Sequence, residues 1–351
     1  MKKIIVYTGL ILMLAACEDI YTAKIDNMEN ALVIDAQIVS NSDSNYIQLS
    51  QTVNFNSSSF LGNQVRNASV YLIDNNNIEY NLPEESIGTF KVNVNINPSL
   101  IYKIRVEYEG ETYESTYESV PEVPKMDSIY GIPEIKVTDF GGVNSVNDFR
   151  EYPGVQLYAN LNNEDSLHYY RFDSRKILQY IYYIESTGMT PPIPIYGWYT
   201  KKLLGGFNLA APADYSTSDR IEKHPLFFME KSLILDQGQS FAGWILILYQ
   251  YSLTSSAYHF YKDLNNQLVG EGRIFDPLYV QARNNLKCTS NPDKLVMGNF
   301  EITSMKETRY FVKFISKEKG YLIKPITHFY EIPSRGEQTG ELPDFWENVY
   351  N

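Results

Sequence analysis

Apolar and polar residues alternate with a period of two over much of residues 31–120. In 90–96, an apolar residue stands at every even position and a polar one at every odd position, and 102–108 repeats the pattern within the predicted strand 101–108. Successive side chains of a strand point to opposite faces, so this pattern predicts half-buried strands. The strands predicted in this way cover 31–39, 46–53, 68–74, 77–82, 90–96, 101–108 and 111–118.

Turn residues separate neighbouring strands of this region. Glu109-Gly110 stands between two alternating runs, as the two-residue turn of a β-hairpin does, and three asparagines at 75–77 predict another turn. About seven short strands in succession are typical of an immunoglobulin-like β-sandwich, which we predict over 31–122. The Cys–Trp–Cys core of antibody domains is missing, so the prediction concerns the architecture alone.

Pro121, Pro124 and Pro133 interrupt the alternation, and we place a domain boundary near 122–125. The larger segment, 125–351, predicts a β-rich domain of antiparallel sheet plus one helix. Its predicted strands cover 154–162, 167–186, 196–208, 229–236, 243–253 and 295–315. The fold class is therefore mainly β.

The helix is predicted near 254–268, where apolar residues recur at spacings of three and four. Thr254 or Ser255 can cap its first turn, and Gly270 follows its end. The apolar positions are Leu253, Ala257, Phe260, Leu264 and Leu268.

The first residues resemble a bacterial lipoprotein signal. Lys2 and Lys3 precede the mostly apolar stretch 4–16, which is shorter than the about 20 residues that a membrane-spanning helix needs. Cys17 follows directly, so removal of the signal peptide 1–16 presents its thiol for lipidation. The residues predicted for signal peptidase recognition are Leu14, Ala15 and Ala16. The alternative is an ordinary secretory signal that happens to contain a cysteine.

Residues 17–30 predict a lipidated tether. Its 13 residues after Cys17 reach about 40–45 Å when fully extended. Glu18 and Asp19 resemble the surface-export signal of Bacteroidota lipoproteins, and the alternative is a merely solvated tether. We therefore expect a lipid-anchored protein of the outer membrane, at the cell surface rather than on the periplasmic face.

The composition and charge of the chain argue against several classes of binding site. The chain carries a formal net charge of −12, which argues against nucleic-acid binding because phosphates need a basic face. Two cysteines cannot form a disulfide framework or a cysteine zinc site. No P-loop or dinucleotide-binding glycine motif is present, and we expect no cofactor.

The candidate catalytic and metal residues do not form known motifs. The sequence around Ser240 does not have the glycine spacing of a nucleophile elbow. Beside Cys288, the sequence identifies no basic residue that could act as a catalytic base. Asp74 begins a faint calcium-loop match, which fails because Glu79 stands where the loop needs glycine. The four histidines show no metal-binding spacing: His168, His224, His259 and His328. We predict no metal site and no catalytic residue.

The segment 180–199 is dense in tyrosine and proline. Prolines stiffen a loop, and aromatic rings offer a large contact area at little entropic cost. The segment is either a contact loop or two core strands joined by a turn, and we keep both interpretations. The candidate contact residues are Pro191, Pro192, Pro194, Tyr196, Trp198 and Tyr199. Ser128 and Ser166, each between Asp and an aliphatic residue, resemble a short O-glycosylation sequon.

A series of short motifs makes the chain resemble a family of Bacteroidota lipoproteins, domain of unknown function 4249. The motifs are ALVIDAQI at 31–38, YKIRVEYEGETYES at 102–115, LTSSAYHFYKDL at 253–264, GRIFDP at 272–277, NLKC at 285–288, NP at 291–292, VMGNF at 296–300 and PDFW at 343–346. Members of this family are often encoded beside TonB-dependent receptors, so the resemblance implies a receptor partner. It implies no catalytic residues.

We therefore expect a non-enzymatic outer-membrane lipoprotein that binds a ligand or partner beside a TonB-dependent receptor. A structural or assembly factor of the outer membrane is the main alternative. A surface hydrolase is a further one, and it would need convergent acids or a nucleophile–histidine pair in a cleft.

Overall fold

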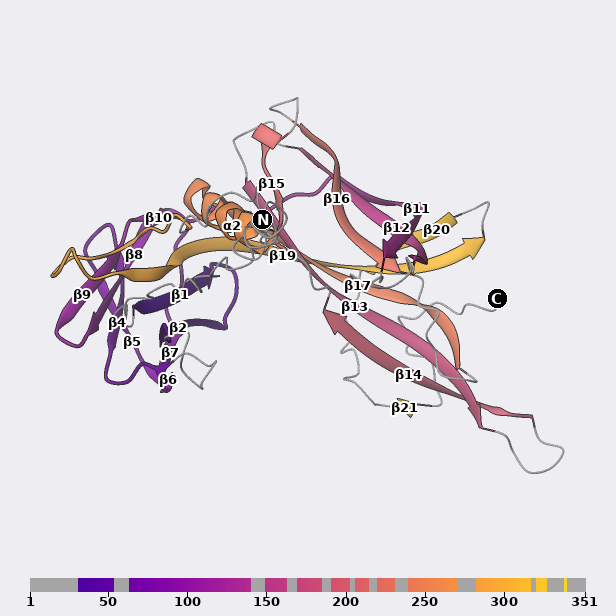
Figure 1. Cartoon of the computed structure of the whole chain (residues 1–351), viewed down its shortest axis with the longest axis horizontal. Helices are drawn as coiled ribbons and strands as arrows, with labels where there is room; N and C mark the ends of the chain where they lie inside the picture. Colours follow the sequence, from indigo (N-terminus) through magenta and orange to yellow (C-terminus); the bar gives the residue numbers. More distant parts are fainter. Residues whose placement is uncertain are drawn as a thin grey trace, which may run out of the picture.

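The chain is mainly β, as the alternation predicts (Figure 1). In this computed structural model, the structure describes residues 31–53, 63–139, 149–162, 169–184, 191–202, 206–214, 220–230, 239–269, 282–316, 320–326 and 338–339. Within these ranges, the one α-helix is α2 (Ser255–Val269), which follows the predicted boundaries closely. At 15 residues, α2 is too short to cross a bilayer, so the described part of the chain contains no helix that could span a membrane.

The strands are grouped here by their order in the chain. The first ten are β1 (Leu32–Val39), β2 (Asn45–Gln51), β3 (Asn63–Gln64), β4 (Ser69–Asp74), β5 (Glu79–Leu82), β6 (Glu84–Ser86), β7 (Thr89–Val92), β8 (Ile101–Tyr108), β9 (Glu111–Ser115) and β10 (Glu118–Ser119). The next are β11 (Ser128–Asp139), β12 (Phe149–Asn162), β13 (Tyr169–Ile184), β14 (Ile193–Lys202), β15 (Asn208–Ala210) and β16 (Arg220–Glu230). The last are β17 (Gln239–Leu253), β18 (Leu286–Cys288), β19 (Val296–Ser316), β20 (Gly320–Pro325) and β21 (Gln338–Thr339).

These strands form three sheets. The largest has 12 strands in the order β21-β14-β13-β17-β19-β1-β2-β7-β6, with β15, β20 and β3 attached to β13, β19 and β2. The second has six strands in the order β18-β9-β8-β4-β5, with β10 attached to β8. The third contains β11, β12 and β16, with β12 in the middle.

One long strand, β19, connects the two ends of the molecule (Figure 1). Its residues 296–303 pair in parallel with β1, whereas 304–312 pair antiparallel with β17. Strand β18 pairs with β9, so the chain returns to its N-terminal strands after helix α2. The segments 31–122 and 125–351 therefore share one sheet. We call β1–β10, β18 and 296–303 the N-lobe, and the remaining described residues the C-lobe.

Each lobe has its own apolar core. In the N-lobe, Ile34, Phe300 and Ile302 of the large sheet share a core with Leu72 and Val106 of the six-stranded sheet. The C-lobe core joins the large sheet to the three-stranded sheet. It includes Trp244 and Leu246 from the former and Val155, Leu157 and Met229 from the latter.

The predicted turns are present. Glu109 and Gly110 both have positive φ angles, 52° and 80°, and they close the β8–β9 hairpin. At 75–77, the Asp74 carboxylate accepts hydrogen bonds from the backbone N–H groups of Asn76 and Ile78. Asp74 is therefore a turn residue, in agreement with the rejection of a calcium loop.

The sequence pattern missed β11, because Pro133 lies in its middle. Proline cannot donate to a strand ladder and is confined to edge strands and bulges. β11 is the edge strand of its sheet and pairs only with β12, so Pro133 opposite Val155 breaks no sheet. Strand β16 also begins earlier than predicted, at Arg220, and carries Pro225.

Candidate functional site: a buried joint under helix α2 and an open pocket beside it

Strand β19 buries polar residues on the face opposite the N-lobe core. Phe300 and Ile302 point into that core, so the alternating Asn299 and Glu301 point to the other face. Helix α2 contacts this face through Tyr261, and the exposed fractions of Asn299 and Glu301 are only 7% and 2%. This part of β19, in which polar and apolar residues alternate, is thus buried on both faces at the point where the two lobes meet.

Arg171 of β13 brings a positive charge to this place. Its guanidinium lies 4.6 Å from the ring centroid of Tyr251 and 4.4 Å from that of Tyr261. Its Nη1 is 3.9 Å from Oε1 of Glu301, to which the Tyr261 hydroxyl donates a hydrogen bond of 2.7 Å. Contacts between a cation and aromatic faces strengthen when water is excluded. We call Arg171, Tyr251, Tyr261, Asn299 and Glu301 the buried joint.

The buried joint is incompletely hydrogen-bonded. Among the described residues, neither amide atom of Asn299 nor Oε2 of Glu301 has a hydrogen-bond partner. Burial raises the pKa of Glu301, and the charge of Arg171 only partly offsets this effect. Burial, together with the nearby Glu301, also raises the pKa of Tyr261 well above its ordinary value. The joint links β19, β13, β17 and α2, so we assign it an orienting role between the lobes.

A second polar contact holds the start of α2. The Tyr258 hydroxyl donates to Asp214 Oδ2 at 2.5 Å, and Lys262 Nζ lies 3.1 Å from Asp214 Oδ1. Although burial raises it, the pKa of Asp214 is lowered overall by these hydrogen bonds. Asp214 belongs to the short 3₁₀ helix η1 (Pro212–Asp214), so the contact fixes α2 to the rest of the C-lobe.

His224 is a buried structural histidine. Both amide hydrogens of Asn208 go to backbone carbonyls, of Pro225 and Leu226, which leaves Asn208 Oδ1 to accept a 2.6 Å hydrogen bond from His224 Nε2. The imidazole stacks on Phe172, and burial lowers its pKa to about 4. His259 lies in α2, with its Nδ1 2.7 Å from the Ser255 carbonyl oxygen. Within the described ranges, no group of three or more His, Cys, Asp or Glu residues could hold a metal ion.

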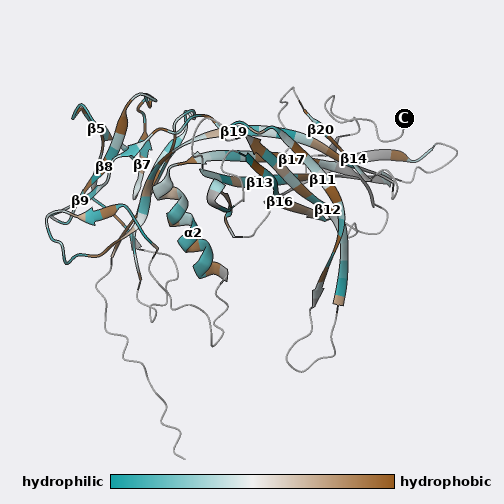
Figure 2. Ribbon diagram, turned by 90° about the horizontal axis from the view of Figure 1, so that it is seen from above, coloured by the Kyte–Doolittle hydropathy of each residue, from teal (hydrophilic) through white to brown (hydrophobic). Residues whose placement is uncertain are grey.

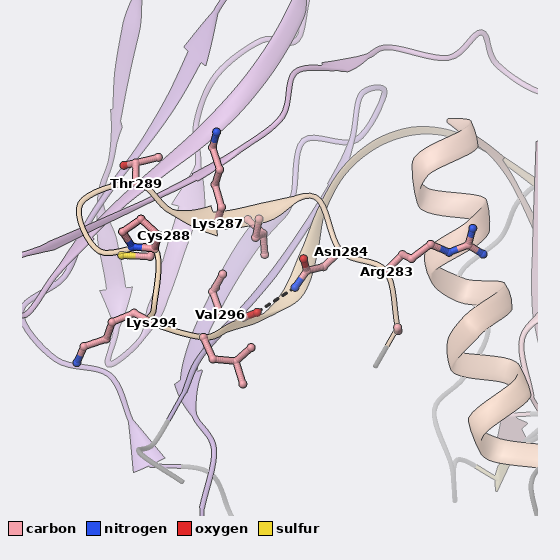
Figure 3. A pocket seen from close by; sticks show the side chains of 11 residues that line it. Arg283, Asn284, Lys287, Cys288, Thr289, Lys294 and Val296 are labelled. Atoms are coloured by element: carbon pink, nitrogen blue, oxygen red, sulfur yellow. Dashed lines mark hydrogen bonds between the residues drawn. The ribbon is translucent and has the colours of Figure 1, made fainter. Parts of the chain in front are cut away.

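An open pocket of about 730 Å³ lies between the chain entering β18 and the start of β19 (Figure 3). Three cations line it, but Figure 3 shows Lys287, Lys294 and Arg283 pointing away from one another. Arg283 turns to α2, where it forms a bidentate ion pair with Asp263 at 2.7 and 2.9 Å. The charges therefore do not converge on a ligand as they would in an anion site.

Cys288 lines the same pocket as a free, buried thiol. Its sulfur lies 3.4 Å from Ser290 Oγ and 3.9 Å from Glu111 Oε2. The Ser290 hydroxyl also donates to Glu111 and lowers the pKa of that carboxyl. The neighbours of the Cys288 sulfur are thus a carboxylate and a hydroxyl. Neither is a cation, and a cationic neighbour is what stabilises a thiolate.

Ser240 and the adjacent acidic residues Glu84 and Glu85 lie in strand, turn and surface positions. Ser240 is the second residue of strand β17, paired with Ile181, instead of standing at a strand-to-helix turn. Glu85 forms an exposed 3.8 Å ion pair with Lys91, and Glu84 accepts a hydrogen bond from the Gly88 backbone. These are surface and turn contacts.

The predicted contact residues belong to a long hairpin. Strands β13 and β14 pair antiparallel from Arg175–Lys202 to Ile184–Ile193, and Figure 1 shows this hairpin extending from the body. Pro191 and Pro192 are exposed beside its end, and Tyr183 is 50% exposed. Pro194, Tyr196, Trp198 and Tyr199 lie on β14, and their side chains are outside the described residues.

Several predicted sites lie outside the described residues altogether. They are Leu14, Ala15, Ala16, Cys17, Glu18, Asp19, Ser166, His168 and His328. Ser128 is described: it is exposed at the start of β11 and accepts a hydrogen bond from Asn160 Nδ2 at 3.0 Å. Its modification stays a prediction.

Comparison with known families identifies the chain. The family model "Domain of unknown function (DUF4249)" matches residues 18–309, which is most of the sequence. The chain belongs to this family. The match covers the N-lobe, most of the C-lobe and the whole buried joint of this DUF4249 protein, whereas strands β20 and β21 and the PDFW motif at 343–346 lie beyond it. No curated protein and no solved structure matches the chain.

Sequence reasoning missed the buried joint of this DUF4249 member. In VMGNFEITS, the polar Asn299 and Glu301 read as an ordinary solvent-facing side of a strand. Arg171 likewise stands between the apolar Tyr170 and Phe172. The missing information was the position of α2, because a strand pattern shows which residues share a face but not what covers that face.

Proposed function

We propose that the protein is a non-enzymatic lipoprotein of the outer membrane that works beside a TonB-dependent receptor and binds the receptor or its cargo. The observation that carries the proposal is the sequence ending in Leu14-Ala15-Ala16-Cys17 after a short apolar stretch. Removal of residues 1–16 leaves 28 basic and 42 acidic side chains, so the anchored body would carry a charge of −14.

The arrangement of the candidate reactive groups supports a binding role over catalysis. Cys288 neighbours Ser290 and Glu111, Ser240 lies inside a strand, and His224 is buried with its Nε2–H bonded to Asn208. Nucleophilic catalysis requires a nucleophile and a base within hydrogen-bond reach and open to substrate. In contrast, the exposed Pro191 and Pro192 beside the β13–β14 hairpin suit contact with another protein.

For the N-lobe, we propose an immunoglobulin-like sandwich over 31–122 that is completed by residues 286–303. Its support is a single core shared by residues of two sheets, such as Ile34 and Leu72. In this role the sandwich would act as a spacer or docking module. Glu18 and Asp19 would direct the protein to the cell surface.

Mild detergent extraction of the native membrane tests this function. We expect the full-length lipoprotein to co-purify with a large outer-membrane barrel. Deletion should impair growth on one nutrient. Recovery of the lipoprotein alone in several gentle detergents, together with general envelope defects after deletion, would instead indicate an assembly factor.

A further inference from the structure

The outer parts of β11 and β12 form an extended hairpin that leaves apolar side chains in solvent. We call residues 132–139 and 149–153 the β-arm. Ile135, Val137 and Phe149 of the β-arm have exposed fractions of 58%, 57% and 59%. Solvent also reaches the intervening residues of β11, since every residue from 132 to 138 is exposed. The β-arm therefore projects from the body, and the described residues of the chain do not cover its apolar groups.

These three apolar residues lie on one face of the β-arm. Val137 pairs with Glu151, so these two side chains point to the same side, and Phe149, two positions from Glu151 on β12, points there as well. Ile135 and Val137 are two positions apart on one strand, and they share that side as well. The described part of this face thus carries three exposed apolar side chains with the Glu151 carboxylate among them, and exposed apolar groups of this kind are typical of an interaction surface.

Helix α2 carries a further exposed apolar residue on the same side of the molecule. Leu268, in the last turn of α2, has an exposed fraction of 66%, the largest of the exposed hydrophobic residues described. Figure 2 shows α2 and the outer ends of β11 and β12 extending to the same side of the large sheet. The two elements are far apart in sequence, yet they extend to the same side of the molecule, and each carries exposed apolar residues.

The length of chain before the described residues indicates what covers this face. Only 13 residues separate Cys17 from Ala31, so an anchored body stays within about 45 Å of the bilayer. A tether of this length gives a second, weak contact a high effective concentration of lipid.

We infer that the β-arm and the end of α2 rest on the lipid surface of the membrane that holds Cys17, with Ile135, Val137, Phe149 and Leu268 entering the interface. The inference rests on the proposed lipid anchor. Glu151 lies on the same face as the three apolar residues of the β-arm, whereas Glu134 and Lys136 point to the opposite face. The described part of this face carries no basic residue, so the contact depends on the apolar side chains and added salt should not weaken it.

Photo-crosslinking of the full-length, lipidated protein tests this contact. Phe149→p-benzoylphenylalanine places the probe on the β-arm. Tyr117→p-benzoylphenylalanine is the matched control, since Tyr117 is a 40% exposed aromatic residue of the N-lobe. Each variant is reconstituted in vesicles of phosphatidylethanolamine and phosphatidylglycerol and irradiated. We expect lipid adducts about tenfold more abundant from position 149 than from 117, at low and high salt alike.

The outcomes separate this inference from the function on which it rests. If the protein does not sediment with vesicles, the lipid anchor fails and the inference fails with it. If it sediments but position 149 gives no more lipid adduct than position 117, the membrane contact alone is wrong. Adducts with a second copy of the chain, or with a barrel protein when native membranes are irradiated, would also overturn it. In the variant Ile135→Ser/Val137→Ser/Leu268→Ser, with Phe149 still carrying the probe, the adducts should fall to the control level.

Discussion

The buried joint and the β-arm depart from the usual hydrophobic pattern in opposite ways. At the joint, the polar Asn299 and Glu301 are covered, whereas on the β-arm the apolar Ile135 and Val137 are left in solvent. Buried polar residues and exposed apolar patches are the informative exceptions to the rule that apolar residues lie inside. The first exception marks where the two lobes are fixed to each other, and the second marks a surface that the isolated protein leaves uncovered.

The two regions also differ in how their pattern arises. Strand β19 is covered on both faces because the N-lobe core packs against one face and α2 against the other. Strand β11 is an edge strand, and its outer half extends past the body. Coverage, not strand propensity, therefore decides which residues of an alternating strand are buried.

The largest effect is expected from removing one charge of the buried joint. Arg171→Leu leaves Glu301 buried without its cation, so we expect a loss of about 3–5 kcal/mol in the free energy of unfolding, measured in urea. Arg220→Leu is the control: this 53% exposed arginine pairs with Asp127 at 3.6 Å and should cost about 1 kcal/mol or less. Equal losses of stability in the two variants would show that the buried charge of Arg171 contributes no more than an exposed one.

Removing both charges sharpens this prediction. Arg171→Leu/Glu301→Leu leaves no uncompensated charge, so the double variant should be more stable than Arg171→Leu. Additive losses would mean that Arg171 acts through its tyrosine contacts and not through Glu301.

The next effect concerns the close approach of β19 to β1. Gly298 has a φ angle of 97°, and a Cβ added there would lie 2.0 Å from the Ile34 carbonyl oxygen. We expect Gly298→Ala to lower the free energy of unfolding by about 3 kcal/mol. Gly110→Ala, with φ of 80° and open space around the added Cβ, isolates the backbone strain and should cost about 1 kcal/mol. Similar losses of stability in the two variants would mean that the close approach of β19 to β1 is not the cause of the effect at Gly298.

A pH-dependent effect is expected in the C-lobe, from His224. Its folded pKa of about 4 is below the unfolded value of 6.5, so protonation favours the unfolded state. Its contribution to stability is full above pH 6.5 and is lost progressively as the pH falls towards 4, by roughly 2–3 kcal/mol. Comparison of wild type with His224→Gln isolates this term, because other groups titrate alike in both. Parallel stability curves between pH 7 and pH 4 would contradict it.

The smallest effect on stability is expected at the β-arm. Ile135→Ser/Val137→Ser/Phe149→Ser changes side chains that are more than half exposed, so we expect the free energy of unfolding to change by about 1 kcal/mol or less. Ile302→Ser, at a fully buried site, is the matched control and should cost about 3 kcal/mol or more. A large loss in the triple variant would mean that the β-arm packs against the body.

The sequence predicts the positions of the strands and the helix far better than it predicts which of them lie next to one another. Alternation located β1, β8 and β19, and the spacing of Ala257 and Leu264 located α2. It could not show that 296–303 returns to pair with β1, because strand pairing depends on contacts distant in the chain. For the same reason the buried joint was missed: Arg171, Tyr261 and Glu301 lie on three separate elements. Pro133 hid β11, since a proline excludes a central strand but not an edge strand.

The N-terminal mass of the native protein tests the central claim most directly. The account predicts that the mature chain begins at Cys17 and that this residue carries acyl chains, with the protein in the outer-membrane fraction. A mature protein that begins elsewhere, or that begins at Cys17 without acyl mass and leaves the membrane in aqueous buffer, would contradict the account. The β-arm would then have no membrane within its reach.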